Sequence, residues 1–277
     1  MTDTRALHPS SMPTSPRRTP RPTPAPVAPV NGYRVFVWTT AIAALVYGTM
    51  HLVGELSLES SLGKIVALTV GAILLPIGAS PVEWFVHRFV YHETKIAPLG
   101  AIHTVHTTHH FTYFPTWRYV TNGEARRLPV SKTTTEAAES TLSNASIRLA
   151  HFSWYMAFGL VFFWIPGWLL SSDGWLVAGL VAGSITVSNL FIVVHDTIHR
   201  PGSHRIVEAQ PWYRFLDNHH WVHHIDLGAN LNFLLPLADL LFGTLRLKAT
   251  DEEVRLHGTL EQAKMHRIGS GERARVA

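Results

Sequence analysis

The chain has 277 residues, of which 47% are hydrophobic and 15% are charged, a charged fraction well below the ~25% usual in soluble domains. Its net charge of +4 is too small to suggest binding to nucleic acid. It contains 18 histidines and no cysteine, which excludes a disulfide framework, cysteine-ligated zinc, an iron–sulfur cluster and thiol catalysis. The composition therefore favours metal binding by imidazole, in or on a membrane.

Both ends of the chain differ in composition from its middle. Residues 1–32 are rich in proline, threonine and serine and contain little that could form a core, so we expect a disordered cytosolic tail. Residues 251–277 are polar and charged, and we expect a second, partly disordered tail there. The folded domain is therefore predicted within residues 33–250.

Four apolar segments lie within that domain, at about residues 35–53, 65–86, 149–170 and 175–194. Each has 19 to 22 residues without lysine or arginine, and a helix that crosses the hydrocarbon layer needs about 20 residues. They predict an all-α integral membrane protein with four transmembrane helices in two hairpins. A further apolar run, 231–241, is too short to span the membrane. We expect it to lie at the membrane surface or to pack beneath the cytosolic part of the domain.

Positive charge is distributed unevenly among the segments that join the predicted helices. Residues 87–148 carry seven lysines and arginines, whereas residues 54–64 carry one and residues 171–174 carry none. Lysine and arginine accumulate on the cytoplasmic side of membrane proteins. Both termini and residues 87–148 are therefore expected in the cytoplasm, and only the two short connections should reach the far side.

Ten of the 18 histidines fall into four ordered groups on the predicted cytoplasmic side. The groups are His87 and His92; His106, His109 and His110; His195 and His199; and His220, His223 and His224. On a helix, residues three and four positions apart leave the same face, so each of the last three groups should point in one direction. His87 and His92 are five positions apart, so we expect the helix to end or bend between them.

The four groups are predicted to bind metal. Ten imidazoles are too many for one ion, and two ions would receive roughly five nitrogens each. Because two groups follow membrane helices directly and two lie in cytosolic segments, all four can converge just below the bilayer. Imidazole binds iron, zinc, copper and nickel, so these residues leave the element open. The sequence predicts a cytosolic helical cap that holds a histidine-rich di-metal site.

Four further side chains are expected to support this site. His103 and His219 adjoin the second and fourth groups, and Asp196 lies inside the third. A carboxylate beside a ligating histidine commonly orients the ring through its other nitrogen. Glu83 lies near the end of a membrane segment, where a carboxylate is costly unless it has a partner. His151, at the start of the third membrane segment, is expected to have an interfacial role.

At these residues the chain resembles the fatty acid hydroxylase / sterol desaturase superfamily of membrane-bound, histidine-rich di-iron oxygenases. The four groups match the histidine motifs of that superfamily in order and spacing, over about residues 80–250. The chain is most similar to the fatty acid 2-hydroxylase branch, which has a further histidine ahead of its second motif, as His103 is here. Residues 239–244, Asp-Leu-Leu-Phe-Gly-Thr, match the Asp-x-x-Phe-Gly-Thr ending of the superfamily.

The resemblance implies an O2-dependent oxidoreductase, a monooxygenase that hydroxylates an aliphatic C–H bond of a lipid-like substrate such as a fatty acyl chain. It implies two iron ions, ligated by the ten histidines, and a supply of two electrons. No cytochrome b5 domain occurs in the sequence, so a separate donor of the ferredoxin or cytochrome b5 type, with its reductase, is expected. The bilayer would deliver the substrate sideways to the site.

Other functions are compatible with the same residues. A desaturase, a decarboxylase or a carotenoid- or sterol-type oxidase of the same superfamily would use the same chemistry and differ in product. A zinc-dependent membrane hydrolase would need only three or four protein ligands and a general base. A metal transporter would need ionisable residues within its membrane segments, and the middles of the four segments contain none.

Overall fold

The computed structural model describes residues 29–56, 59–92, 99–100, 102–103, 106, 110, 118–121, 124–127, 145–199 and 204–250, and for residues 118–121, 124–127, 145–147 and 199 it describes the backbone alone. The two expected tails lie outside this part of the chain, apart from residues 29–32.

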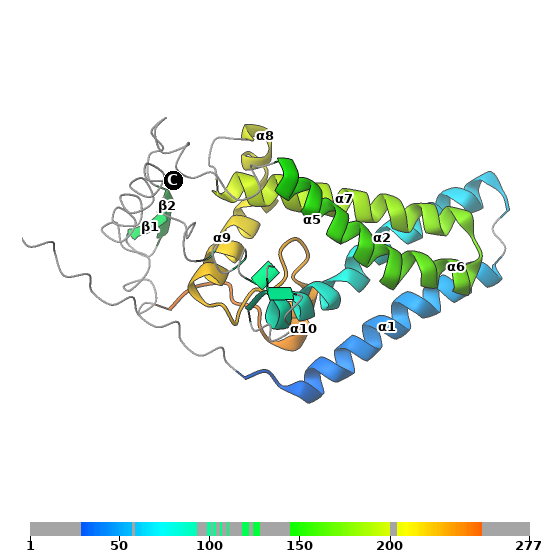
Figure 1. The fold of residues 1–277 in the computed structure, drawn as a ribbon, viewed down its shortest axis with the longest axis horizontal. Coiled ribbons are helices and arrows are strands. Elements are labelled where there is room, and N and C mark those ends of the chain that lie inside the picture. Colours follow the sequence, from blue (N-terminus) through cyan, green and yellow to red (C-terminus); the bar gives the residue numbers. More distant parts are fainter. Residues whose placement is uncertain are drawn as a thin grey trace, which may run out of the picture.

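Four long helices dominate the fold. They are α1 (Gly32–Glu55), α2 (Ser61–Phe85), the continuous run of α5 (Ala145–Gly159), η4 (Leu160–Trp164) and α6 (Ile165–Ser171), and α7 (Gly174–His199). All four are long and apolar enough to cross a membrane, which confirms the four predicted segments. In Figure 1 they run alongside one another, with the α1–α2 and α6–α7 connections at one end of the bundle.

Three of these helices begin at a side chain that caps the first turn. Asn31, Ser60 and Asp173 accept hydrogen bonds from backbone N–H groups at the starts of α1, α2 and α7, at 2.7 to 3.1 Å. Such caps satisfy donors that have no partner within the helix. The polar residues that separate the apolar segments therefore also fix where each helix starts.

Two glycines mark a close approach between α2 and α7. Gly71 on α2 lies against the backbone of α7, and Gly179 on α7 lies against the backbone of α2. A methyl group at either position would overlap a main-chain carbonyl of the other helix. Small residues allow this contact between membrane helices, where packing replaces the hydrophobic effect as the source of association.

Apolar side chains occupy both the interior and the outer surface of the bundle. Val46, Met50 and Leu180 are buried between the long helices. Phe36 and Leu169, on the outer surface, are 69% and 74% exposed. Large apolar groups exposed along whole helices are unusual in water-soluble proteins and are expected where lipid is the solvent.

The other end of the bundle carries the remaining described elements. They are the π-helical turn η1 (Val86–His92), which continues α2, and the helices α8 (Arg205–Glu208), α9 (Pro211–Ile225) and α10 (Leu237–Phe242). Figure 1 shows α8, α9 and α10 at this end. A two-stranded antiparallel ribbon, β1 (Arg118–Thr121) and β2 (Glu124–Arg127), interrupts the otherwise helical architecture and was not predicted. Residues 231–233 are buried here, whereas Leu235 and Leu240 are exposed, so the placement of the run 231–241 relative to a membrane stays a prediction.

Candidate metal centre

Five histidines from three of the sequence groups meet beyond the end of α2. They are His87 and His92 on η1, His106, His110, and His223 on α9. One nitrogen from each ring lies within 4.8 Å of the others, so the group could hold a metal ion. His110 and His223 are buried, and the site is therefore shielded from water on that side.

The nitrogens of this five-histidine group are too close together for a set of hydrogen-bonded rings. Nε2 of His106 lies 3.0, 2.9 and 2.9 Å from the Nε2 atoms of His87, His92 and His110. A neutral imidazole carries one proton, so His106 can share a hydrogen bond with at most one of these rings. Lone pairs that face one another repel unless a cation lies among them. This set of donor atoms therefore fits a metal ion.

Burial keeps two of these rings neutral. The pKa of His110 is lowered well below its usual value, first by burial and then by the neighbouring imidazoles. Burial also lowers the pKa of His223 to about 4, against the opposing effect of its hydrogen bond to the Ala229 carbonyl. Metal binding requires an unprotonated nitrogen, which both rings offer at neutral pH.

The π-helical turn explains how His87 and His92 join one group. We expected the helix to end or bend between them, and instead it continues through Val86–His92 with wider winding. Residues five apart lie nearly above one another where hydrogen bonds run from i to i+5, whereas in an α-helix they diverge. The two ring centroids are consequently 4.9 Å apart.

Backbone carbonyls of residues 229–232 orient three histidines. Nδ1 of His87 donates to Leu231 at 2.6 Å, Nδ1 of His223 donates to Ala229 at 2.7 Å, and Nε2 of His219 donates to Asn232 at 2.7 Å. For His87 and His223 this fixes the proton on Nδ1 and leaves the lone pair on Nε2, which faces the other rings. The sequence gives no direct signal for these carbonyls, because any residue supplies one.

Asp239 holds the same segment in place. Its carboxylate accepts hydrogen bonds from the N–H groups of Leu231 and Asn232, at 2.9 and 2.7 Å, and from the Thr244 hydroxyl at 2.6 Å. Thr244 in turn accepts a hydrogen bond from the indole of Trp84 on α2 at 2.9 Å. Burial raises the pKa of Asp239 to about 6, so the group is ionised at neutral pH. The segment 239–244 thus ties the carbonyls that orient the histidines to α2.

A second set of histidines adjoins the five-histidine group. Nε2 of His224 lies 3.0 Å from Nε2 of His220, and the ring of His195 on α7 lies 4.9 Å from that of His220. The rings of His110 and His224 are 4.4 Å apart, so the two sets are contiguous. His220, His223 and His224 were expected to point one way, but His223 belongs to the first set, because adjacent helical positions diverge by about 100°.

Two of the ten predicted ligands, His109 and the side chain of His199, lie outside the described residues. The other eight lie in these two sets. Their role as ligands to two ions stays a prediction.

The supporting side chains have specific partners. Glu83 accepts hydrogen bonds from the Phe233 N–H at 3.1 Å and from the Asn232 amide at 3.3 Å, and so holds the 229–233 segment from the side of α2. The ring of His103 is hydrogen-bonded through Nδ1 to the Tyr91 carbonyl at 2.6 Å, outside the five-histidine group. His219 likewise binds a carbonyl of residues 229–232.

Asp196 has two partners outside the ten predicted ligands. It is fully buried, and its carboxylate forms an ion pair with Arg148 at 3.1 Å and lies 3.6 Å from Nε2 of His204. These contacts connect the end of α7 to the start of α5 and to the turn before α8.

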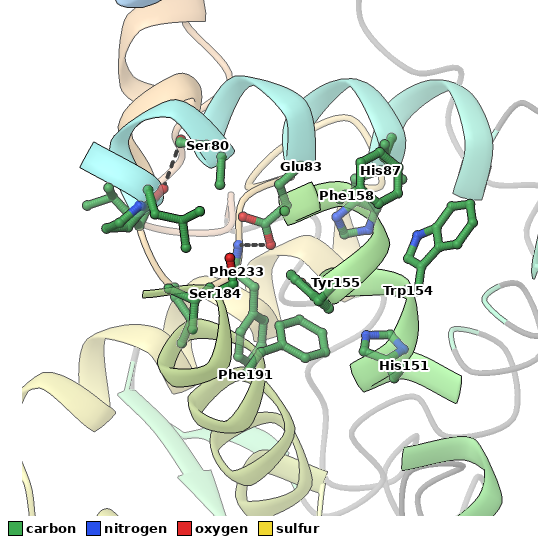
Figure 2. Close-up of a pocket in the computed structure, with 18 of the residues that line it drawn as sticks. Ser80, Glu83, His87, His151, Trp154, Tyr155, Phe158, Ser184, Phe191 and Phe233 are labelled. Atoms are coloured by element: carbon green, nitrogen blue, oxygen red, sulfur yellow. Dashed lines mark hydrogen bonds between the residues drawn. The ribbon is translucent and has the colours of Figure 1, made fainter. Parts of the chain in front are cut away.

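An apolar cavity ends at both sets of histidines. It lies between α2, α5 and α7, with residues 233–235 along one side, and has an empty volume of about 1080 Å³ including its mouth. His87 and His106 of the first set and His195 and His220 of the second set line it. Figure 2 shows side chains of α5 facing Glu83 on α2 and His87 on η1. From Leu75 to His87 the wall extends about 18 Å along α2 and the start of η1.

Comparison with protein-family models, curated proteins and solved structures found no match to this chain.

Proposed function

We propose that this protein is a membrane-bound non-haem di-iron monooxygenase that hydroxylates an aliphatic C–H bond of a lipid-like substrate. The observation that carries the proposal is the cavity, whose apolar wall lies among helices long enough to span a membrane and whose end is lined by histidines that could hold a metal ion. A fatty acyl or related chain fits such a space. The resemblance to the fatty acid hydroxylase / sterol desaturase superfamily supports the same function.

The two sets of histidines would each hold one ion. His87, His92, His106, His110 and His223 would form the first site. His195, His220 and His224, together with His199 and His109, would form the second. Bound iron would supply the redox chemistry with O2 that oxidation of an unactivated C–H bond requires.

The protein residues would position the chain and keep water out. Phe158 and Phe163 from the third helix and Leu75 from α2 line the apolar part of the cavity. They would hold the chain in an extended path that leads between His87 and His195. A carbon fixed at that point reacts without the entropic cost of bringing it there. Exclusion of water protects reactive species from side reactions.

The proposed orientation places the histidine end of the bundle and both termini in the cytoplasm. A soluble ferredoxin or cytochrome b5 type donor could then deliver electrons directly to the metal end. The bilayer surrounds the cavity walls, so a lipid-like substrate would not have to cross water.

The test is a combined metal and product analysis. The full chain, purified from iron-supplemented cells, should contain about two iron ions per chain, as expected for ten imidazole ligands. Lipid extracts from cells with the protein should contain a hydroxylated lipid that carries label from isotopically labelled dioxygen. A product that carries the oxygen label and has no new double bond identifies hydroxylation. A product with a new double bond and no oxygen label would assign the protein to the desaturases. One tightly bound zinc ion and no oxygen-dependent product would overturn the proposal in favour of a hydrolase.

A further inference from the structure

The cavity extends lengthwise between three helices, away from the histidines. On each helix its lining residues run from a histidine to a residue nearer the connections of the bundle: His87 to Leu75, His151 to Phe163, and His195 to Ser184. At 1.5 Å per residue, each of these walls is about 16 to 18 Å long. Figure 2 shows Ser184 at the left and His87 and His151 at the right. The cavity is therefore long enough to take an extended chain parallel to the helices.

Leu75, Phe163 and Ser184 form the floor of the cavity, at the end opposite the histidines. All three are buried, at 3%, 4% and 4% exposure. Leu75 and Phe163 belong to the apolar core that fills the bundle beyond them, together with Leu180. The Ser184 hydroxyl donates to the Leu180 carbonyl at 3.0 Å and accepts from the Trp164 indole at 3.1 Å. These contacts hold the floor in place.

Three glycines bring the helices together at the level of the floor. Each is so close to a floor residue that a methyl group added to it would come within 3.1 Å of that residue: Gly78 near Phe163, Gly159 near Ser184, and Gly183 near Leu75. The three contacts join α2 to the third helix, the third helix to α7, and α7 to α2. The described helices therefore leave no gap at this level through which a chain could pass.

A chain in this cavity is most stable with its methyl end on the floor. Atoms that line an unfilled apolar space lose contacts, so a chain gains contacts until it fills the space. A polar head group would lose its hydrogen bonds to water at the floor, because the Ser184 hydroxyl already donates its one proton to Leu180. The methyl end therefore enters first, and the head group stays at the histidine end or beyond it.

We infer that the floor fixes which carbon is oxidised, by its distance from the methyl end of the chain rather than from the head group. An extended chain advances about 1.2 Å per bond, so the carbon at the histidines lies roughly 12 to 15 carbons from the methyl end. The inference rests on the proposed function, because it concerns the carbon that the metal site would oxidise. It adds no step to that reaction, in which one atom of O2 enters a C–H bond and the other leaves as water with two electrons and two protons.

The position of the hydroxyl group in chains of different length tests the inference. Cells that contain the protein are supplied with isotopically labelled hexadecanoic or octadecanoic acid, and mass spectrometry locates the hydroxyl group in the labelled lipids. Its distance from the methyl end should be the same in both products, so its position counted from the head group should shift by two carbons. A position that is constant from the head group would overturn the inference and leave the proposed function intact. Absence of any oxygenated lipid would refute the proposed function itself.

Two variants move the floor in opposite directions. Ala79 lines the cavity on α2, four residues or about 6 Å nearer the histidines than Leu75. Ala79→Phe should raise the floor and move the hydroxyl group about five carbons closer to the methyl end, whereas Ala157→Phe, at an exposed position of α5, is the matched control and should not move it. Phe163→Leu should lower the floor and move the hydroxyl group one or two carbons away from the methyl end. Phe162→Leu, at the exposed neighbour, should have no effect. Oxidation at the wild-type carbon in both floor variants would overturn the inference.

A photoreactive probe measures the position of the methyl end without turnover. Hexadecanoic acid with a diazirine next to its methyl end is bound to the purified full chain and illuminated, and the modified peptides are identified by mass spectrometry. Adducts should lie near Leu75, Phe163 or Ser184 and should decrease when unlabelled hexadecanoic acid competes. Competed adducts beside His87 or His195 would place the methyl end at the metal site and overturn the inference alone. Adducts that no competitor reduces would refute the cavity as a chain site, and with it the substrate part of the proposed function.

Discussion

Replacement of Asp239 by alanine should weaken metal binding, although Asp239 is not itself a predicted metal ligand. The substitution leaves three buried donors without an acceptor, namely the N–H groups of Leu231 and Asn232 and the hydroxyl of Thr244. Each unsatisfied buried donor costs about 1–3 kcal/mol, so the free energy of unfolding should fall by about 3 kcal/mol or more. The freed segment would also release the carbonyl that orients His87.

Loss of such an outer contact typically lowers metal affinity by about 10- to 100-fold. Titration of the loaded protein with a chelator, followed by elemental analysis, measures this change, and thermal unfolding measures the loss of stability. Asp173→Ala is a matched control, because Asp173 also accepts two backbone N–H bonds but caps α7 at the far end of the bundle. It should cost about 1 kcal/mol of stability and no metal affinity. Chelator curves that coincide for Asp239→Ala and wild type would refute the role assigned to residues 229–232.

Three further predictions concern the metal site and the bundle. His92→Ala should remove bound metal and abolish product, whereas His51→Ala should retain both. Elemental analysis and a product assay measure the two effects. A His92→Ala protein that is fully loaded with metal and active would disprove that His92 is a metal ligand. Gly179→Val should lower the free energy of unfolding by about 1–3 kcal/mol, because the valine side chain would overlap the backbone of α2. A side chain at Gly48 would meet no atom within 4 Å, so Gly48→Val should leave the thermal unfolding temperature unchanged. Because the pKa of His223 is lowered to about 4, protons should displace metal from this ring only as the pH falls towards 4. In a metal-release assay, metal that is bound at pH 7 should therefore still be bound at pH 5. Complete release near pH 6.5 would contradict this prediction.

The long helices could be predicted from the sequence because their signal is local. A run of about 20 apolar residues has few alternatives to a membrane helix, and the capping residues Asn31, Ser60 and Asp173 mark the starts. The grouping of the histidines was predictable for a related reason, since a helix repeats every three to four residues. The same reasoning failed between His87 and His92, where a π-helical turn replaced the expected bend.

The contacts that orient the site were not predictable from the pattern of residues. The carbonyls of Ala229 and Leu231 have no side-chain signature, and they reach His223 and His87 only because the segment after α9 folds back against α9 and η1. The only signal in the sequence was indirect, namely the polar residues Asp239 and Thr244 a few positions after the segment 229–232. Asp196 shows another contact that its place in the sequence does not reveal, because its carboxylate pairs with Arg148, 48 positions away along the chain.

The orientation of the bundle in the membrane can be tested independently of its chemistry. Because the chain has no cysteine, single cysteines can be introduced without background labelling. Ser60 and Ala209 are both exposed, the first at the start of α2 and the second between α8 and α9 at the histidine end. If positive charge sets the orientation, Ser60→Cys should react with a membrane-impermeant maleimide in intact cells, and Ala209→Cys should react only after lysis. Reaction of Ala209→Cys in intact cells would place the histidines on the outer face, where no cytosolic reductase could reach them, and the proposed supply of electrons would have to be abandoned.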